Sequence, residues 1–155
     1  MAEYAKDLIV LVADNDIRHT IDVLLSRRRH SLGIRALQYD IINHLNRDSG
    51  CYKEAHAFLR PLCDTHRYAL VLFDREGSGK ESLSVEQLQQ NVQDLLNANG
   101  WDGRSAVIAF DPEFDVWFWN DSPHVATVLG WREGLSSLRN WLVANSLLSK
   151  GEIKP

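Results

Sequence analysis

A chain of 155 residues with 45% hydrophobic and 25% charged side chains is long enough for one buried core and has the composition of an ordinary globular protein. The formal net charge of −4 excludes a surface that is basic throughout, although a local basic patch or an acidic cleft balanced by cations is compatible with it. No apolar run reaches the ~20 residues of a membrane span, and Cys51 and Cys63 form no CxxC motif, so we expect a cytoplasmic protein with reduced thiols and no membrane association.

Four apolar segments, each followed by a helical pattern, indicate the order of the elements. The first segment, Leu8–Ala13, is apolar without alternation, which is typical of a strand buried on both faces, and it ends at Asp14. The patterns after it predict a helix from Ile17 to Gly33, a partly alternating strand over Ile34–Ile42, a polar loop over 43–50, a helix over 52–62 capped by Asp48 or Ser49, a strand over Tyr68–Phe73, a helix begun by a capping box of Ser84 and Gln87 and closed by Gly100, and a strand over Ala106–Phe110.

The chain after the fourth strand is predicted to be helical and rich in tryptophan. We expect residues 1–155 to form a single domain in which 112–150 is this C-terminal helical part. Most of the tryptophans are predicted to be core residues. Trp119 and Trp131 lie beside polar or glycine positions, which favours a partner surface or a base-stacking site.

Strands that alternate with helices predict a three-layer α/β fold, with a mostly parallel four-stranded sheet and helices on both faces. Right-handed crossovers place the carboxyl ends of parallel strands along one edge, where ligands bind in such sheets. Asp14 and Asp74 each end a fully apolar strand. If the first and third strands are neighbours, these two carboxylates converge.

The stretch Asp74–Ser82, DREGSGKES, admits two interpretations. A phosphate-binding loop of the G-x-x-x-x-G-K-[ST] type needs glycine where Asp74 stands and a hydroxyl residue where Glu81 stands, so the sequence argues against it. As a carboxylate site, Asp74 and Glu76 lie two residues apart and share one face of an extended backbone, with Arg75 turned away. Lys80 would then add a positive charge for a phosphate.

Oxygen ligands of this kind suit Mg²⁺ or Mn²⁺. Asp14 can supply a further carboxylate from the neighbouring strand. The alternative is that Asp14 or Asp16 simply caps the first helix, and the sequence leaves both possibilities open. The basic run Arg27–His30 sits at the end of that helix, where cations complement the helix dipole, so we expect it to be a solvated face away from the cleft.

These acid-terminated strands, together with the glycines after the third strand, resemble the Toprim fold of topoisomerases, primases and small nucleases. The similarity covers about residues 6–120. It implies metal-binding and catalytic roles for Asp14, Asp74 and Glu76. Asp14 stands where the family has glutamate, and Glu76 stands where it has the second aspartate of its pair.

A second stretch, FDPEFDVWFWND at residues 110–121, is similar to the acid-x-Trp helix of Toprim-like proteins in prokaryotic defence systems. The resemblance makes Asp115 an additional metal ligand with Trp117 packed behind it. The alternative is that Asp111, Glu113 and Asp115 complement a helix dipole.

The resemblance implies a Mg²⁺-dependent enzyme that acts on nucleic-acid phosphodiesters, as a metal-dependent nuclease or phosphodiester transferase and as a nuclease component of a bacterial defence system. DNA or RNA would be its partner, and a protein partner of a multi-component system is a further expectation. The alternative is a non-catalytic Toprim-like interaction subunit of a larger complex. A receiver-like phosphoacceptor domain is a third interpretation, favoured only by the VADND segment that contains Asp14.

Overall fold

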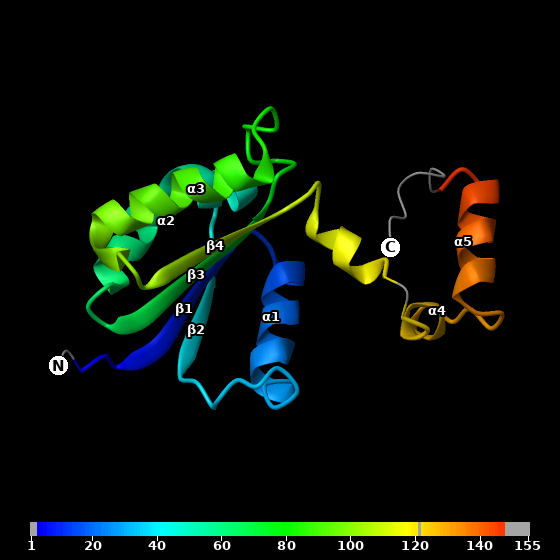
Figure 1. The fold of residues 1–155 in the computed structure, drawn as a ribbon, viewed down its shortest axis with the longest axis horizontal. Helices are drawn as coiled ribbons and strands as arrows, with labels where there is room; N and C mark the ends of the chain where they lie inside the picture. Colours follow the sequence, from blue (N-terminus) through cyan, green and yellow to red (C-terminus); the bar gives the residue numbers. More distant parts are fainter. Residues whose placement is uncertain (1–2, 121, 148–155) are drawn as a thin grey trace. The chain divides into compact units, whose positions relative to one another are not determined.

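The computed structural model describes residues 3–120 and 122–147. Strands and helices alternate through the first part of the chain, and three helical segments follow the last strand (Figure 1). In chain order the elements are β1 (Lys6–Val12), α1 (Asn15–Arg27), β2 (Tyr39–Asn43), α2 (Arg47–Leu59), η1 (Arg60–Leu62), β3 (His66–Asp74), α3 (Val85–Leu96), η2 (Asn97–Trp101), β4 (Ser105–Phe110), η3 (Phe114–Phe118), α4 (His124–Val128) and α5 (Leu135–Ala144).

The four strands form one parallel sheet in the order β2-β1-β3-β4. Val10 of β1 lies opposite Ile41 of β2 on one side and Leu70 of β3 on the other. The prediction of a parallel sheet is therefore confirmed, and β1 and β3 are neighbours. Because all four strands run the same way, the segments that follow them leave the sheet at a single edge.

Helices cover both faces of the sheet. Helix α1 packs on β1 and β2, and α2 and α3 pack together on the opposite face against β1, β3 and β4 (Figure 1). Ile9, Leu11 and Phe73 of the central strands have no exposed surface, and they pack with Leu88 and Leu96 of α3 in one core. The predicted three-layer α/β class is thus confirmed, and the arrangement is consistent with Rossmann-like and Toprim-like folds.

The chain divides into two compact units, residues 1–114 and residues 115–155. The first contains the sheet and its three covering helices. The second contains most of η3 together with α4 and α5, and the division falls inside the expected helical part 112–150. In the part of the chain that the structure describes, no helix combines the length and apolar character needed to cross a membrane.

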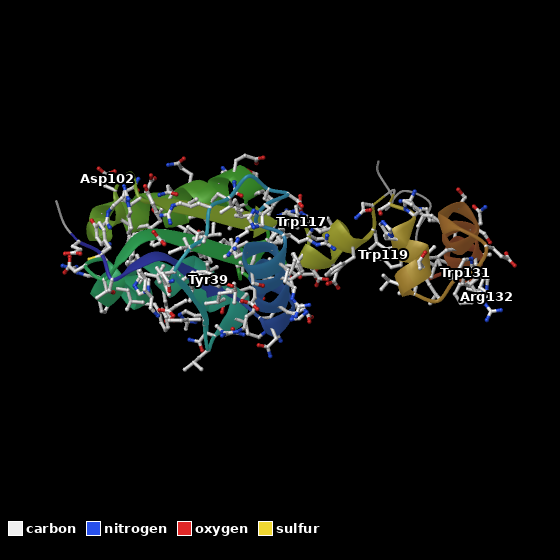
Figure 2. The ribbon with its side chains drawn as sticks, turned by 90° about the horizontal axis from the view of Figure 1, so that it is seen from below. Tyr39, Asp102, Trp117, Trp119, Trp131 and Arg132 are labelled. Atoms are coloured by element: carbon white, nitrogen blue, oxygen red, sulfur yellow. The ribbon has the colours of Figure 1, made fainter. Side chains whose placement is uncertain are left out.

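The expectation that most tryptophans are core residues is wrong. Trp101 is completely buried, whereas the Trp117 and Trp141 side chains are 47% and 46% exposed. Trp119 and Trp131 are half-buried. Trp117, Trp119 and Trp131 all extend from the second unit (Figure 2). The described residues of the second unit form helical segments and no strand, so they provide no sheet on which to bury these rings.

Several predicted boundaries were also wrong. The second strand begins at Tyr39 instead of Ile34, because the preceding segment is held beside β1 by Asp7. The carboxylate of Asp7 accepts hydrogen bonds from Arg35 and from the Gln38 backbone N–H.

The helix boundaries also differ in part from the prediction. Helix α1 ends at Arg27, ahead of Gly33. Neither Asp48 nor Ser49 caps the second helix, whose N-cap is Asn46. The predicted capping box of Ser84 and Gln87 is confirmed.

Candidate carboxylate site

Asp14 directly follows β1 and begins α1. Its Oδ1 accepts hydrogen bonds from the backbone N–H groups of Asp16, at 3.0 Å, and Ile17, at 2.9 Å. The capping role is therefore real, since one carboxylate oxygen satisfies two N–H groups that no helix carbonyl can reach. The other oxygen, Oδ2, lies 3.9 Å from the guanidinium of Arg47. Asp14 can cap the helix and still present an oxygen toward the loop after β2.

Asp74 ends β3 and is linked to the chain that follows each of two other strands. Its Oδ1 accepts a hydrogen bond of 2.8 Å from the backbone N–H of Phe114, beyond β4. Its own backbone N–H donates to Oδ1 of Asp48, also at 2.8 Å. Asp48 belongs to the first turn of α2, after β2. Asp48, which was predicted to cap a helix, therefore contacts Asp74, which was predicted to be a site residue. The sequence did not indicate this contact.

An open pocket of about 530 Å³ lies between these segments. We call it the carboxylate pocket, and it is lined by Leu45, Asn46, Arg47, Asp48, Asp74, Glu76, Gly77 and Glu113. Asp14 stands beside it through its approach to Arg47. Each strand thus contributes one acid at or beyond its carboxyl end: Asp14 after β1, Asp48 after β2, Asp74 at the end of β3 and Glu113 after β4. The pocket lies at the edge where the carboxyl ends of the strands meet.

The acids act on one another electrostatically. Burial raises the pKa of Asp74 to about 7, and the charges of Asp48, Asp14 and Glu113 contribute in the same direction, against the lowering effect of the Phe114 N–H. Burial, followed by the charge of Asp14, also raises the pKa of Asp48, while the hydrogen bond from Asp74 and the charge of Arg47 oppose the rise. Asp74 therefore changes its charge near neutral pH, which is unusual for an aspartate.

In the glycine loop, Gly77–Glu81, the pKa of a carboxyl group is lowered, whereas that of Asp74 is raised. Oε1 of Glu81 accepts hydrogen bonds of 3.1 Å from the backbone N–H groups of both Gly77 and Gly79. Backbone hydrogen bonds lower the pKa of Glu81. Both glycines have positive φ, 85° and 76°, so the loop needs their conformational freedom. The N–H groups that would cradle a phosphate in a nucleotide-binding loop are occupied by the chain's own carboxylate.

Arg75 holds the glycine loop in place. Its Nε donates to the carbonyl of Leu83 at 3.0 Å, one terminal nitrogen donates to the carbonyl of Glu81 at 2.6 Å, and the other pairs with Asp111 at 2.9 Å. Arg75 does not line the carboxylate pocket. Its guanidinium bonds Leu83, Glu81 and Asp111, which agrees with the prediction that Arg75 turns away from the face of Asp74 and Glu76.

The segment His44–Gly50 joins β2 to the first turn of α2 and carries Arg47 and Asp48, and we call it the support loop. The buried ring of His44 accepts a hydrogen bond at Nδ1 from the Asn46 backbone N–H, at 3.1 Å, and its Nε2 lies 3.4 Å from Glu54. Gly50 lies against this ring so closely that a Cβ there would be 2.1 Å from His44 Nδ1. The path of the support loop is therefore fixed by a buried histidine and a glycine.

The remaining predicted site residues lie in different places. Glu76 is exposed and lines the carboxylate pocket together with Asp74. Lys80 is exposed in the glycine loop and is not among the residues that line the pocket. Asp115 belongs to the second unit, where it lines an apolar pocket beside Trp117 and Trp119, so its assignment to the site of Asp74 stays a prediction.

The donor atoms at the carboxylate pocket suit a hard divalent cation, which prefers carboxylate oxygens and water. Oδ1 of Asp14, Asp48 and Asp74 each accept backbone hydrogen bonds, which leaves one oxygen of each carboxylate for another ligand. Among the described residues, no three His, Cys, Asp or Glu side chains are grouped so that they could hold a metal ion in their present positions. The residue types therefore fit Mg²⁺, and binding would require the side chains to move toward the ion.

Comparison of the chain with models of protein families, with curated proteins and with solved structures found no match in any of the three.

Proposed function

We propose that this chain is a Toprim-like, Mg²⁺- or Mn²⁺-dependent enzyme that acts on nucleic-acid phosphodiesters, as a nuclease or phosphodiester transferase. One observation supports the proposal above all others. Asp14 follows β1, Asp48 lies in the first turn of α2 after β2, and Asp74 ends β3; burial, with a further contribution from the charges of Asp48 and Asp14, raises the pKa of Asp74 to about 7. Like charges are held together in folded proteins where a cation compensates them or where their pKa values are needed for chemistry.

Asp14, Asp48 and Asp74 would hold the cation, with Glu76 and Glu113 at the rim of the pocket. When bound, the cation would stabilise the negative charge on the phosphoryl oxygens of the substrate. The backbone N–H of Phe114 orients the carboxylate of Asp74 by its hydrogen bond to Oδ1. The pKa of Asp74 is raised to about 7 without a cation, and a bound cation would oppose this rise because it favours the charged carboxylate.

The setting proposed for this activity is the cytoplasm, as part of a bacterial defence system with DNA or RNA as substrate. Cys51 and Cys63 are both free thiols, which is consistent with a reducing compartment. The Toprim resemblance supports the nucleic-acid substrate.

The test is a nuclease assay on DNA and on RNA with Mg²⁺ or Mn²⁺, combined with thermal melting in the presence of each cation. Asp74→Ala and Asp14→Ala should abolish both turnover and the cation-induced rise in melting temperature. Asp102→Asn is the matched control, because Asp102 is an exposed aspartate that precedes β4 and therefore belongs to the other edge of the sheet (Figure 2). If Asp74→Ala turns over substrate as fast as the wild type, the assignment of the catalytic site is rejected.

The second candidate is a non-catalytic interaction subunit, and the second unit favours it. Its apolar pocket is lined by large hydrophobic side chains that are 47–84% exposed: Trp117, Phe118, Leu129 and Val128. An exposed apolar cluster of this kind is typical of a protein-binding surface. Melting temperatures that do not respond to Mg²⁺, together with stable co-purification of one protein, would support this function over the enzymatic one.

A further inference from the structure

Arg47 is the one cationic side chain among the described residues that line the carboxylate pocket. Its side chain is 71% exposed. Its nearest acidic partner is Oδ2 of Asp14, at 3.9 Å, which is too long for a hydrogen bond. A guanidinium paired with a carboxylate usually forms two short hydrogen bonds. The guanidinium N–H groups of Arg47 are therefore left to solvent, or to a ligand that enters the pocket.

The position of Arg47 is fixed by its backbone. Arg47 has a φ of 49°, in the left-handed region that a non-glycine residue rarely occupies. Its backbone N–H donates to the carbonyl of His44 at 3.1 Å, and the buried ring of His44 and the close approach of Gly50 hold the rest of the support loop. Strained backbone of this kind persists where surrounding contacts enforce it, and it is common at ligand-binding sites.

An anionic substrate that approaches this pocket meets the charges of Asp48, Asp74, Glu76 and Glu113. A bound cation would offset part of this repulsion, and an arginine at the rim would offset more. The planar guanidinium offers parallel N–H groups that match two oxygens of one phosphate. Lys80, the phosphate contact predicted from the sequence, lies outside the pocket in the glycine loop, whose N–H groups at Gly77 and Gly79 already bind Glu81.

We infer that Arg47 binds the two non-bridging oxygens of the substrate's phosphodiester at the rim of the carboxylate pocket. This assignment rests on the proposed function and deepens it, because it gives the substrate class a specific recognition group. Arg47 is a substrate-binding residue in this scheme, and the cation is held by the carboxylates without it. Loss of Arg47 should therefore weaken substrate binding while cation binding remains.

The experiment measures the binding of a short fluorescein-labelled single-stranded oligonucleotide by anisotropy in the presence of Ca²⁺, with DNA and RNA in separate arms. Arg47→Gln should weaken binding by roughly 10- to 100-fold, as expected for the loss of hydrogen bonds between charged groups. Arg47→Lys keeps the charge without the fork and should give an intermediate loss. Arg28→Gln is the control, since Arg28 is an exposed arginine at the C-terminal end of α1 and the substitution changes the net charge equally.

A second measurement separates this inference from the proposed function. The rise in melting temperature with Mn²⁺ should be the same in Arg47→Gln as in the wild type, which also shows that the variant is folded. Equal oligonucleotide binding by the wild type and Arg47→Gln, or no binding by the wild type in either arm, would reject the role of Arg47. A wild type that binds the oligonucleotide through Arg47 but shows no Mn²⁺ response and no turnover would retain the inference and reject the enzymatic proposal.

Discussion

The glycine loop and the carboxylate pocket adjoin each other and treat negative charge in opposite ways. In the glycine loop the charge of Glu81 is compensated by the backbone N–H groups of Gly77 and Gly79, and its pKa is lowered. In the pocket Asp74 is partly buried among other acids, and its pKa is raised to about 7. The loop resembles an anion-binding motif but already contains its anion, whereas the pocket contains acids that favour the arrival of a cation.

This difference shows why a glycine-rich sequence is weak evidence for phosphate binding. The positive φ angles of Gly77 and Gly79 create a set of N–H donors, and a side chain four residues further on can satisfy them as well as a ligand can. A carboxylate that is partly buried beside other acids, as Asp74 is, is the better indication of a functional site, because burial and mutual repulsion of the charges destabilise the folded chain.

The largest expected effect separates the two regions by activity. Asp48→Asn should lower Mg²⁺-dependent turnover by about 100-fold or more, as much as Asp74→Asn does, because loss of one electrostatic contribution at a reacting centre typically has that size. Glu81→Gln should change turnover less than about twofold, since Glu81 faces its own loop. Steady-state rates of the three variants provide the check. An Asp48→Asn variant with wild-type turnover would show that the support loop is structural only.

The next effect concerns the support loop. Gly50→Ala should destabilise the protein by about 1–3 kcal/mol, because a Cβ would lie 2.1 Å from the buried His44 ring and 2.9 Å from Cβ of Asn46. Chemical denaturation measures the change. Ala57→Ser, at an exposed position on the same helix, should stay within about 0.5 kcal/mol of the wild type. A stable Gly50→Ala protein would mean that the loop adapts and does not fix Asp48.

The third effect depends on pH and tests the uncompensated charge of Asp74. A carboxyl whose pKa is raised on folding contributes stability below its unfolded pKa, and this contribution is lost as pH rises toward the folded value of about 7. Asp74→Asn removes that loss and keeps an oxygen for the Phe114 N–H. In EDTA its melting temperature should exceed that of the wild type by about 2–4 °C at pH 8, and the difference should shrink steadily between pH 7 and pH 4. A difference that is constant over this range would argue against a raised pKa.

The smallest effect has the opposite dependence on pH. The pKa of Glu81 is lowered on folding, so its contribution to stability is present above its unfolded pKa and is lost as pH falls. Glu81→Gln should lower the melting temperature slightly at pH 7, by less than about 2 °C because the group is exposed, and should match the wild type near pH 3. Melting curves at the two pH values check this, with Asp102→Asn as the control at an exposed acid.

Much of the fold could be predicted because it depends on local pattern. The continuous apolar runs of β1 and β3 and the alternation of strands with helices identified a parallel sheet, and the acids at its carboxyl edge followed from that. The second strand was placed too early because Ile34 and its neighbours have strand-like composition, although Asp7 holds this segment outside the ladder. Most tryptophans were expected to be core residues, but the side chains of Trp117 and Trp141 in the second unit are about half exposed.

The candidate site could be predicted only in part. Asp14, Asp74 and Glu76 were identified because they stand at strand ends or in a D-x-E pair. Asp48 was assigned to a helix cap, since nothing in its own segment indicates that its carboxylate meets the backbone of Asp74. Arg47 was not identified at all. The support loop contains an Arg-Asp pair between a histidine and a glycine. This pattern points to a site only once the structure shows that Asp48 contacts the end of β3.

By itself, the sequence determined the order of the elements, the parallel sheet and the acids that end its strands, because these follow from the periodicity of side chains along a single segment. Only the tertiary structure decided which charges influence one another: Asp48 with Asp74, Arg47 beside Asp14, and Glu81 within the glycine loop. The physical reason is that electrostatic and hydrogen-bond energies depend on distance in space and on burial, and neither can be read from separation along the chain.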